Sequence, residues 1–176
     1  MKKFRSSLPV ILTLAALALV FTSCADSDVP DGMIRASVEA DSFDFFVPKG
    51  WTVNTGTGTA SAYYSSSDRS NVSFVAMVVD ADMSDFDEYI EKADQSFSSV
   101  LPGYTGISER QETTMCGSPA VSFEYSATVD GVEWRFMQTV TARGHSFYIL
   151  TYTAEADKYE SHLDSVKQIT ENVRFK

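Results

Sequence analysis

The fold of this 176-residue chain is decided by residues 121–137, which read VSFEYSATVDGVEWRFM. Apolar and polar residues alternate on both sides of Asp130-Gly131, and a period of two is typical of a strand with one buried face. Asp-Gly favours a two-residue hairpin turn, because both central positions of that turn require a positive φ. The stretch therefore predicts two antiparallel strands joined by a tight turn. In the second strand, one face is expected to carry Val132, Trp134 and Phe136, and the other Glu133, Arg135 and Met137.

Further strand patterns flank this hairpin. Runs rich in β-branched and aromatic residues predict strands at residues 34–40, 43–47, 52–53, 60–64, 72–79 and 147–153. A mostly polar run at 106–115 predicts an edge strand. The polar second faces of several strands indicate that part of the sheet is wet or covered only by loops.

Two segments carry apolar residues at three- and four-residue spacing, which predicts amphipathic helices. The first runs from Phe86 to Leu101, with Ser84 as its N-cap. The second is expected to place on its inner face Tyr159, Leu163, Val166, Ile169 and Val173. The order of strands, helix, strands and helix predicts an α+β fold in which helices cover an antiparallel sheet.

The start of the chain has the architecture of a secretory signal peptide. Lys2, Lys3 and Arg5 precede an apolar run at 8–21, and two small polar residues then lead to Cys24. This ending resembles the lipobox of bacterial lipoproteins, in which the cysteine is acylated and becomes the mature N-terminus. The resemblance departs from the usual pattern in one respect, because Phe21 stands where Leu is usual. Two alternatives are an uncleaved transmembrane anchor, for which the apolar run is short, and plain secretion with an incidental Cys24.

These features divide the chain into three parts. We expect residues 1–23 to be the lipoprotein signal peptide, residues 24–33 an acidic tether after the lipidated Cys24, and residues 34–176 a single domain. Acyl chains such as palmitate on Cys24 would anchor the protein to a cell membrane, facing outside the cytoplasm. The sequence leaves open which membrane of the bacterial cell envelope this is.

The charge argues against a nucleic-acid partner, and the cysteine content argues against a disulfide framework. The precursor has 14 basic and 24 acidic residues, and loss of Lys2, Lys3 and Arg5 with the signal leaves 11 basic residues and a net charge of −13. Such a surface repels nucleic acid and anionic headgroups, so no nucleic-acid partner is expected. Acylation of Cys24 would leave Cys116 without an intramolecular partner, so no disulfide framework is expected.

Three segments resemble the PsbP-like family, which has the Mog1/PsbP fold, and especially its bacterial lipoprotein members of unknown function. They are FDFFVPKGW at 43–51, GSPA at 117–120 and YILTY at 148–152. The resemblance spans essentially the whole mature domain and implies a six- or seven-stranded antiparallel sheet packed against helices. Family members with known roles are non-catalytic binding or assembly subunits. No family binding residue matches a position in this sequence.

The segment from Asp80 to Glu91 has oxygen-bearing residues at several positions of a calcium-binding loop. However, Asp85 occupies the position where that loop needs Gly, and helical spacing already begins at Phe86. An acid-rich helix start explains the same residues, since the helix dipole favours acids there. We therefore predict no metal and no other cofactor, with calcium left open.

The sequence presents no assembled catalytic site. Cys116 with His145 or His162 could supply a nucleophile and a base, but nothing in the sequence brings them together. There is no Gly-x-Ser-x-Gly elbow, no phosphate-binding glycine loop and no zinc-ligand spacing. We predict no catalytic residues, and a small extracytoplasmic enzyme remains the alternative.

Most aromatic residues are expected in the core of a sheet-on-helix domain. Tyr63 and Tyr64 are the exception, because adjacent strand residues face opposite ways and one of the two should be exposed. With the loops at 54–58 and 65–70, they form a candidate binding surface. We expect a non-catalytic module that binds a protein or a cell-envelope component close to the membrane.

Overall fold

The computed structural model describes residues 28–56, 59–79 and 85–176. The predicted signal peptide and Cys24 lie outside these residues. No helix in the described ranges has the length and apolar character needed to cross a membrane.

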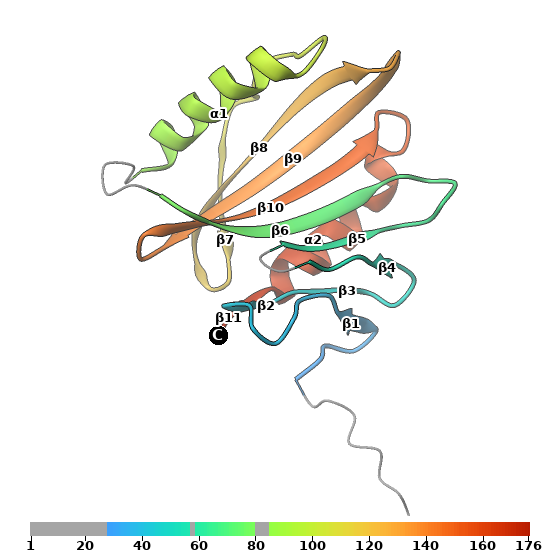
Figure 1. The fold of residues 1–176 in the computed structure, drawn as a ribbon, viewed down its shortest axis with the longest axis vertical. Coiled ribbons are helices and arrows are strands. Elements are labelled where there is room, and N and C mark those ends of the chain that lie inside the picture. Colours follow the sequence, from blue (N-terminus) through green and yellow to red (C-terminus); the bar gives the residue numbers. More distant parts are fainter. Residues whose placement is uncertain (1–27, 57–58, 80–84) are drawn as a thin grey trace, which may run out of the picture.

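A seven-stranded antiparallel sheet forms the centre of the domain, in the order β4-β5-β6-β10-β9-β8-β7 (Figure 1). This confirms the predicted α+β class. The strands are β4 (Thr52–Val53), β5 (Thr59–Tyr63), β6 (Asn71–Val78), β7 (Gln111–Met115), β8 (Ser118–Val129), β9 (Val132–Arg143) and β10 (Ser146–Glu155). The polar strand β7 lies at one edge, as predicted for that region.

The β8–β9 hairpin has the predicted turn. Asp130 has a φ of 53° and Gly131 a φ of 77°, so both lie in the left-handed region that this turn requires. Val129 is paired with Val132 across the turn. The predicted alternation is also confirmed, because Phe136 packs into one core of the domain and Met137 against the other.

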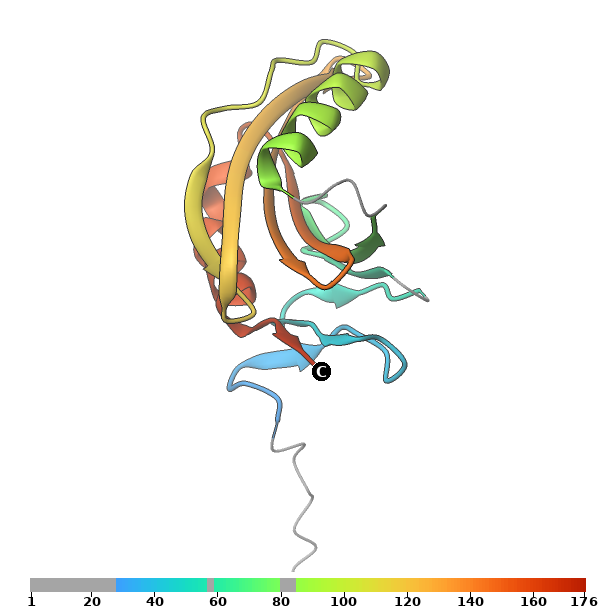
Figure 2. The ribbon, with the colours of Figure 1, turned by 90° about the vertical axis from the view of Figure 1, so that its left-hand side faces the viewer.

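Two helices cover opposite faces of this curved sheet (Figure 2). On one face lies α1 (Phe86–Val100), whose Tyr89 and Ala93 pack with apolar residues of β8, β9 and β10. On the other lie a 3₁₀ turn, η1 (Tyr159–His162), and α2 (Leu163–Asn172). We call the two faces the α1 side and the α2 side.

The helix starts differ slightly from the predictions. The N-cap of α1 is Asp85, whose carboxylate accepts a hydrogen bond from the Glu88 amide at 2.8 Å, one residue later than the predicted cap at Ser84. Tyr159 precedes α2 in η1 rather than lying within the helix. The inner-face residues Val166 and Ile169 are buried as predicted.

The strand predicted at 43–47 is wrong in detail, because the structure breaks it into two short strands. β2 (Phe43–Asp44) pairs with β11 (Arg174–Phe175), and β3 (Phe46–Pro48) pairs with β1 (Met33–Arg35). Phe45 and Phe46 are adjacent, yet both are buried in the α2-side core. A regular strand turns adjacent side chains to opposite faces, so burying both on one side requires a break between them.

Candidate binding site on the open face of the sheet

The α1 side of the sheet is covered only in part. In β10, Phe147 and Ile149 are buried beneath α1, whereas Thr151 and Thr153 on the same face are half-exposed. Alternate residues of a strand share a face, so these four side chains follow one line across the α1 side. Figure 1 shows α1 beside β8 and β9, towards the opposite end of the strand order from β4 and β5. The part of the α1 side beyond the helix is therefore open to solvent.

This open face consists of polar side chains, most of them small, in two cross-strand rows. In one row Ser61 of β5 pairs with Ser73 of β6, which pairs with Thr151 of β10. In the next, Tyr63 pairs with Asn71, which pairs with Thr153. All six side chains are half-exposed or exposed. The prediction that part of the sheet is wet is thus confirmed, and the wet part is at the β5–β6 end.

Trp134, Arg69 and Glu155 border the open face at one end. Trp134 of β9 pairs with Glu155 of β10, and the Arg69 guanidinium lies 4.8 Å from the centre of the Trp134 ring. Arg69 Nη2 also donates to Glu155 Oε1 at 2.7 Å. Since Arg69 belongs to the β5–β6 turn, these contacts attach that turn to the neighbouring strands on the α1 side.

The residue before Arg69 attaches the same turn on the α2 side. Asp68 Oδ2 accepts a hydrogen bond from His162 Nε2 at 2.8 Å, and Asp68 Oδ1 accepts from the Ser70 hydroxyl at 2.6 Å and the Ser70 amide at 3.0 Å. Burial by itself would raise the pKa of Asp68, but the hydrogen bonds from Ser70 and His162 outweigh it and lower the pKa to about 2. The β5–β6 turn is therefore held from both faces of the sheet.

Tyr63 and Tyr64 are both exposed, at 38% and 41%, whereas the sequence predicted exposure of one. The reason is that β5 ends at Tyr63, so strand alternation no longer buries the next side chain. Tyr64 instead rests on the α2 side, with its ring 4.3 Å from that of His162 and 5.9 Å from that of Trp51. Only Tyr63 faces the open side of the sheet.

A pocket of about 390 Å³ lies beside Tyr63, which we call the corner pocket. Its floor is the end of β5 and the start of β6, and its wall is the β5–β6 turn. The lining residues are Asn54, Ser61, Ala62, Tyr63, Ser65, Ser66, Arg69 and Asn71. The pocket thus draws on both predicted loops, 54–58 and 65–70, although residues 57–58 lie outside the described part of the chain.

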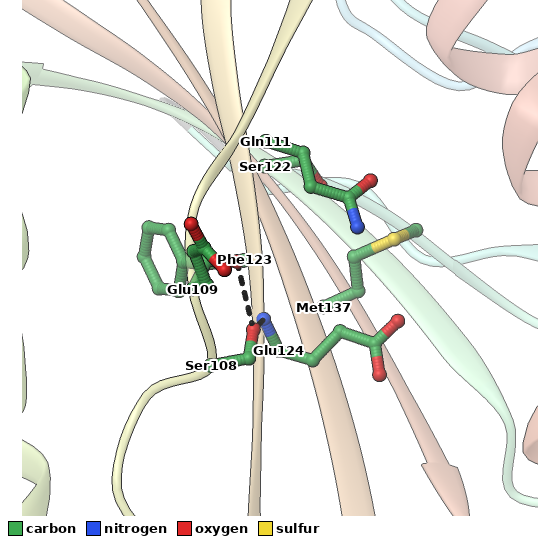
Figure 3. Close-up of a pocket in the computed structure, with 7 residues that line it drawn as sticks. All are labelled: Ser108, Glu109, Gln111, Ser122, Phe123, Glu124 and Met137. Atoms are coloured by element: carbon green, nitrogen blue, oxygen red, sulfur yellow. Dashed lines mark hydrogen bonds between the residues drawn. The ribbon is translucent and has the colours of Figure 1, made fainter.

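A second hollow, of about 340 Å³, lies between the segment before β7 and strands β8 and β9 (Figure 3). Ser108 Oγ accepts a hydrogen bond from the Glu124 amide at 2.8 Å and so closes one end. The hollow contains the carboxylates of Glu109 and Glu124. Glu124 is already bound by Arg135 at 2.8 Å, and Arg135 also binds Glu160 at 2.8 Å. Because its charge is compensated within the fold, Glu124 is better suited to holding β8 and β9 together than to acid–base chemistry.

The structure places the candidate nucleophile, Cys116, and the candidate bases, His145 and His162, in different surroundings. Cys116 is half-buried in the turn before β8 and packs against the α2-side core, and burial raises the pKa of its thiol to about 12. His162 is bound to Asp68, while His145 is exposed in the β9–β10 turn. Across the described ranges, no hydrogen bond joins Cys116 to either histidine. A thiol that stays protonated is a poor nucleophile.

The segment from Asp80 to Glu91 can be judged only in part, since residues 80–84 lie outside the described chain. Asp85 caps α1 and Phe86 already begins the helix, so the second half of the hypothetical calcium loop is helical. Among the described residues, no three His, Cys, Asp or Glu side chains come together as metal ligands.

Sequence reasoning missed the Asp68–His162 pair. The two residues lie 94 positions apart, in a turn and at the start of a helix, and no local pattern relates them. Trp134, which the sequence places in the core with most of the aromatic residues, is only half-buried, at the border of the open face. The Asp130-Gly131 hairpin indicated the strand that carries Trp134, but the sequence did not indicate which part of the sheet α1 covers.

A sequence model of the PsbP family, described as PsbP, matches residues 32–175. No curated protein matches the chain.

Several solved structures share its fold. The cyanobacterial PsbP (CyanoP) of Synechocystis is 14% identical, with a TM-score of 0.62, covering 82% of this chain and 93% of that one. LpqN, involved in cell envelope biogenesis of Mycobacterium tuberculosis, is 16% identical, with a TM-score of 0.53 and coverage of 82% and 90%. The Saccharomyces cerevisiae Ran-binding protein Mog1p is 12% identical, with a TM-score of 0.52 and coverage of 77% and 83%.

Proposed function

This chain belongs to the PsbP family, and from that premise we propose that it is a non-catalytic binding or assembly module held outside the cytoplasm by a lipid on Cys24. Its binding surface is the open face of the sheet with the corner pocket beside Tyr63. The observation that carries this proposal is the contrast within β10, where apolar residues lie under α1 and half-exposed threonines lie beyond it. A sheet face that no helix of the described ranges covers, bordered by Tyr63 and Trp134, offers a partner both aromatic and polar contacts.

The similar structures support a binding role. LpqN is described as involved in cell envelope biogenesis, and Mog1p as a Ran-binding protein. A cell-envelope component or an envelope protein is the corresponding partner for an exported member of this fold.

The lipid anchor would keep the module near the membrane. Residues 24–33 span at most about 35 Å when extended, and the described chain enters the fold at β1, at the end of the molecule that also holds the C-terminus (Figure 1). Each buried lipid CH₂ contributes about 0.8 kcal/mol, so two or more acyl chains give durable anchoring.

Replacing Cys24 tests the anchor. The Cys24→Ala variant should remain unprocessed or be released from the membrane fraction, while a Cys116→Ala control fractionates like the wild type. Normal cleavage and normal membrane retention of Cys24→Ala would show that the lipoprotein assignment is wrong.

Two features support binding over turnover. In the described ranges no hydrogen bond joins the Cys116 thiol to a histidine, His162 is bound to Asp68, and burial raises the pKa of the thiol. The acidic hollow at β7–β8 has one of its two carboxylates engaged by Arg135. A small extracytoplasmic enzyme is the alternative, and it predicts a turnover that Cys116→Ala abolishes.

Site-specific crosslinking in living cells tests the binding surface. A photoreactive amino acid at position 63 should capture a partner in the intact lipoprotein, and the same group at position 78 should not. Val78 is a suitable control because it is 80% exposed but lies at the far end of β6. Equal capture at both positions, or none at either, would contradict a binding role for the open face.

A further inference from the structure

We propose that the corner pocket binds a neutral sugar unit of a glycan. This inference rests on the proposed function and narrows its partner to a carbohydrate.

The pocket offers hydrogen-bonding groups that the fold leaves free. In the described ranges, the side-chain amide of Asn54 and the hydroxyls of Tyr63 and Ser66 have no hydrogen-bond partner. The Asn71 amide nitrogen donates to the Arg69 carbonyl at 3.0 Å, which leaves its carbonyl oxygen as an acceptor. Amides and hydroxyls supply donors and acceptors together. This is what a sugar requires, because each of its hydroxyls can both donate and accept.

Tyr63 adds an apolar surface to these polar groups. Its side chain is 38% exposed and lines the pocket. One face of a pyranose ring presents mainly C–H groups, which pack well against an aromatic ring. The other nearby aromatic residue, Trp134, already has its ring next to Arg69. Tyr63 is therefore the residue available for stacking within the pocket.

The charge of the pocket favours an uncharged ligand. Among the described residues that line it, Arg69 is the charged one, and its guanidinium is already bound to Glu155 at 2.7 Å. A ligand anion would have to compete with that carboxylate, and a ligand cation would meet the guanidinium. Neither charge sign gains a new partner, so a neutral ligand fits best.

Size and composition favour a sugar over a protein side chain. A volume of about 390 Å³ lies within the usual range of small-molecule sites. Three serines and two asparagines line it, whereas the buried centres of protein–protein interfaces are depleted in serine and rich in large apolar residues. The wall of the pocket is also ordered beforehand, because Asp68 and Arg69 hold the β5–β6 turn from both sides. Such preorganisation lowers the entropy cost of binding.

Titration with neutral oligosaccharides tests this inference. The full mature chain is titrated with trimers and hexamers of β-1,4-N-acetylglucosamine, β-1,4-glucose and α-1,4-glucose, and amide chemical shifts are recorded. At least one sugar should bind saturably and shift the resonances of Tyr63, Ser66 and Asn71. Tyr63→Ala and Asn54→Ala should each weaken binding about tenfold or more, which corresponds to about 1.4 kcal/mol. The matched controls Val78→Ala and Gln111→Ala should bind like the wild type.

The outcomes separate this inference from the proposed function. Absence of saturable binding across the whole panel overturns the sugar assignment, and so does sugar binding that Tyr63→Ala and Asn54→Ala leave unchanged. If the sugars fail but the crosslinker at position 63 still captures a protein, the module binds a protein and the proposed function stands. If both fail, both are wrong.

Discussion

The covered and open parts of the α1 side share strands and backbone geometry but differ in side chains. Under α1, the sheet presents Phe123, Val140 and Ile149, all buried. Beyond it, the same strands and their neighbours present Ser73 and Thr151, both half-exposed. A sheet face left without a helix would be a large apolar patch if it kept the first composition. The open face is therefore specified by the polarity of its side chains, and its aromatic residues are confined to its border.

The largest loss of stability is expected in the part of the sheet that α1 covers. Phe123→Ala should lower the free energy of unfolding by about 3–5 kcal/mol, because it removes a side chain that is 2% exposed and leaves a cavity under α1. The matched change in the open part, Ser73→Ala, should stay within about 0.5 kcal/mol. Chemical denaturation measures both. Similar losses in the two variants would mean that the two parts do not differ in packing.

A smaller loss of stability is expected at the attachment of the β5–β6 turn on the α2 side. His162→Ala should cost about 1–3 kcal/mol, because it leaves the partly buried carboxylate of Asp68 with one hydrogen-bond partner fewer. The double variant with Asp68→Asn should lose less than the sum of the single changes, since the two residues act as a pair. Strict additivity in denaturation experiments would argue against their coupling.

The pH dependence of stability should report on the same turn. The pKa of Asp68 is lowered in the folded state to about 2 from an ordinary value of 3.8. The stabilisation is therefore complete above about pH 4 and is lost as the pH falls through about 2, with a total of roughly 2 kcal/mol. Unfolding curves between these pH values should show this decline in the wild type. The decline should be weaker in Asp68→Asn, and an identical profile in the variant would exclude Asp68 as its source.

The smallest stability effect is expected at Tyr63. Tyr63→Ala should change the free energy of unfolding by no more than about 0.5 kcal/mol, because the side chain is exposed and the fold does not depend on its contacts. It should nevertheless weaken partner binding. A thermal melt and a partner-binding measurement on the same preparation distinguish the effect on stability from the effect on binding. A variant with a much lower melting temperature would mean that Tyr63 contributes to the packing of the domain.

Much of the fold could be predicted from local patterns. The β8–β9 hairpin, the span of α1 and the buried face of α2 all follow from periodicity and turn residues, which act over a few positions. The double strand at 43–48 could not be predicted this way. Its break depends on Phe45 and Phe46 both reaching the α2-side core, which is a tertiary requirement.

The candidate site also has features that the sequence predicted and features that it did not. Tyr63 and the polar turn at 65–70 were found from exposure patterns, whereas the attachment of that turn was not. Asp68 meets His162 across 94 positions, and Arg69 reaches Trp134 and Glu155 on two other strands. Contacts of this kind depend on strand order, and no single stretch of the chain encodes strand order.

The sequence by itself determined the α+β class, the antiparallel hairpin, the acidic surface and the existence of a wet sheet face, because each depends on composition or on a local period. Only the tertiary structure decided where that wet face lies. Its position depends on α1 covering β8, β9 and β10 and leaving β5 and the start of β6 uncovered. It also depends on the attachment of the β5–β6 turn from both faces of the sheet. The physical reason is that the coverage of the sheet by α1 and the contacts of the β5–β6 turn join residues that are far apart in the sequence. Such contacts form only when the chain is packed.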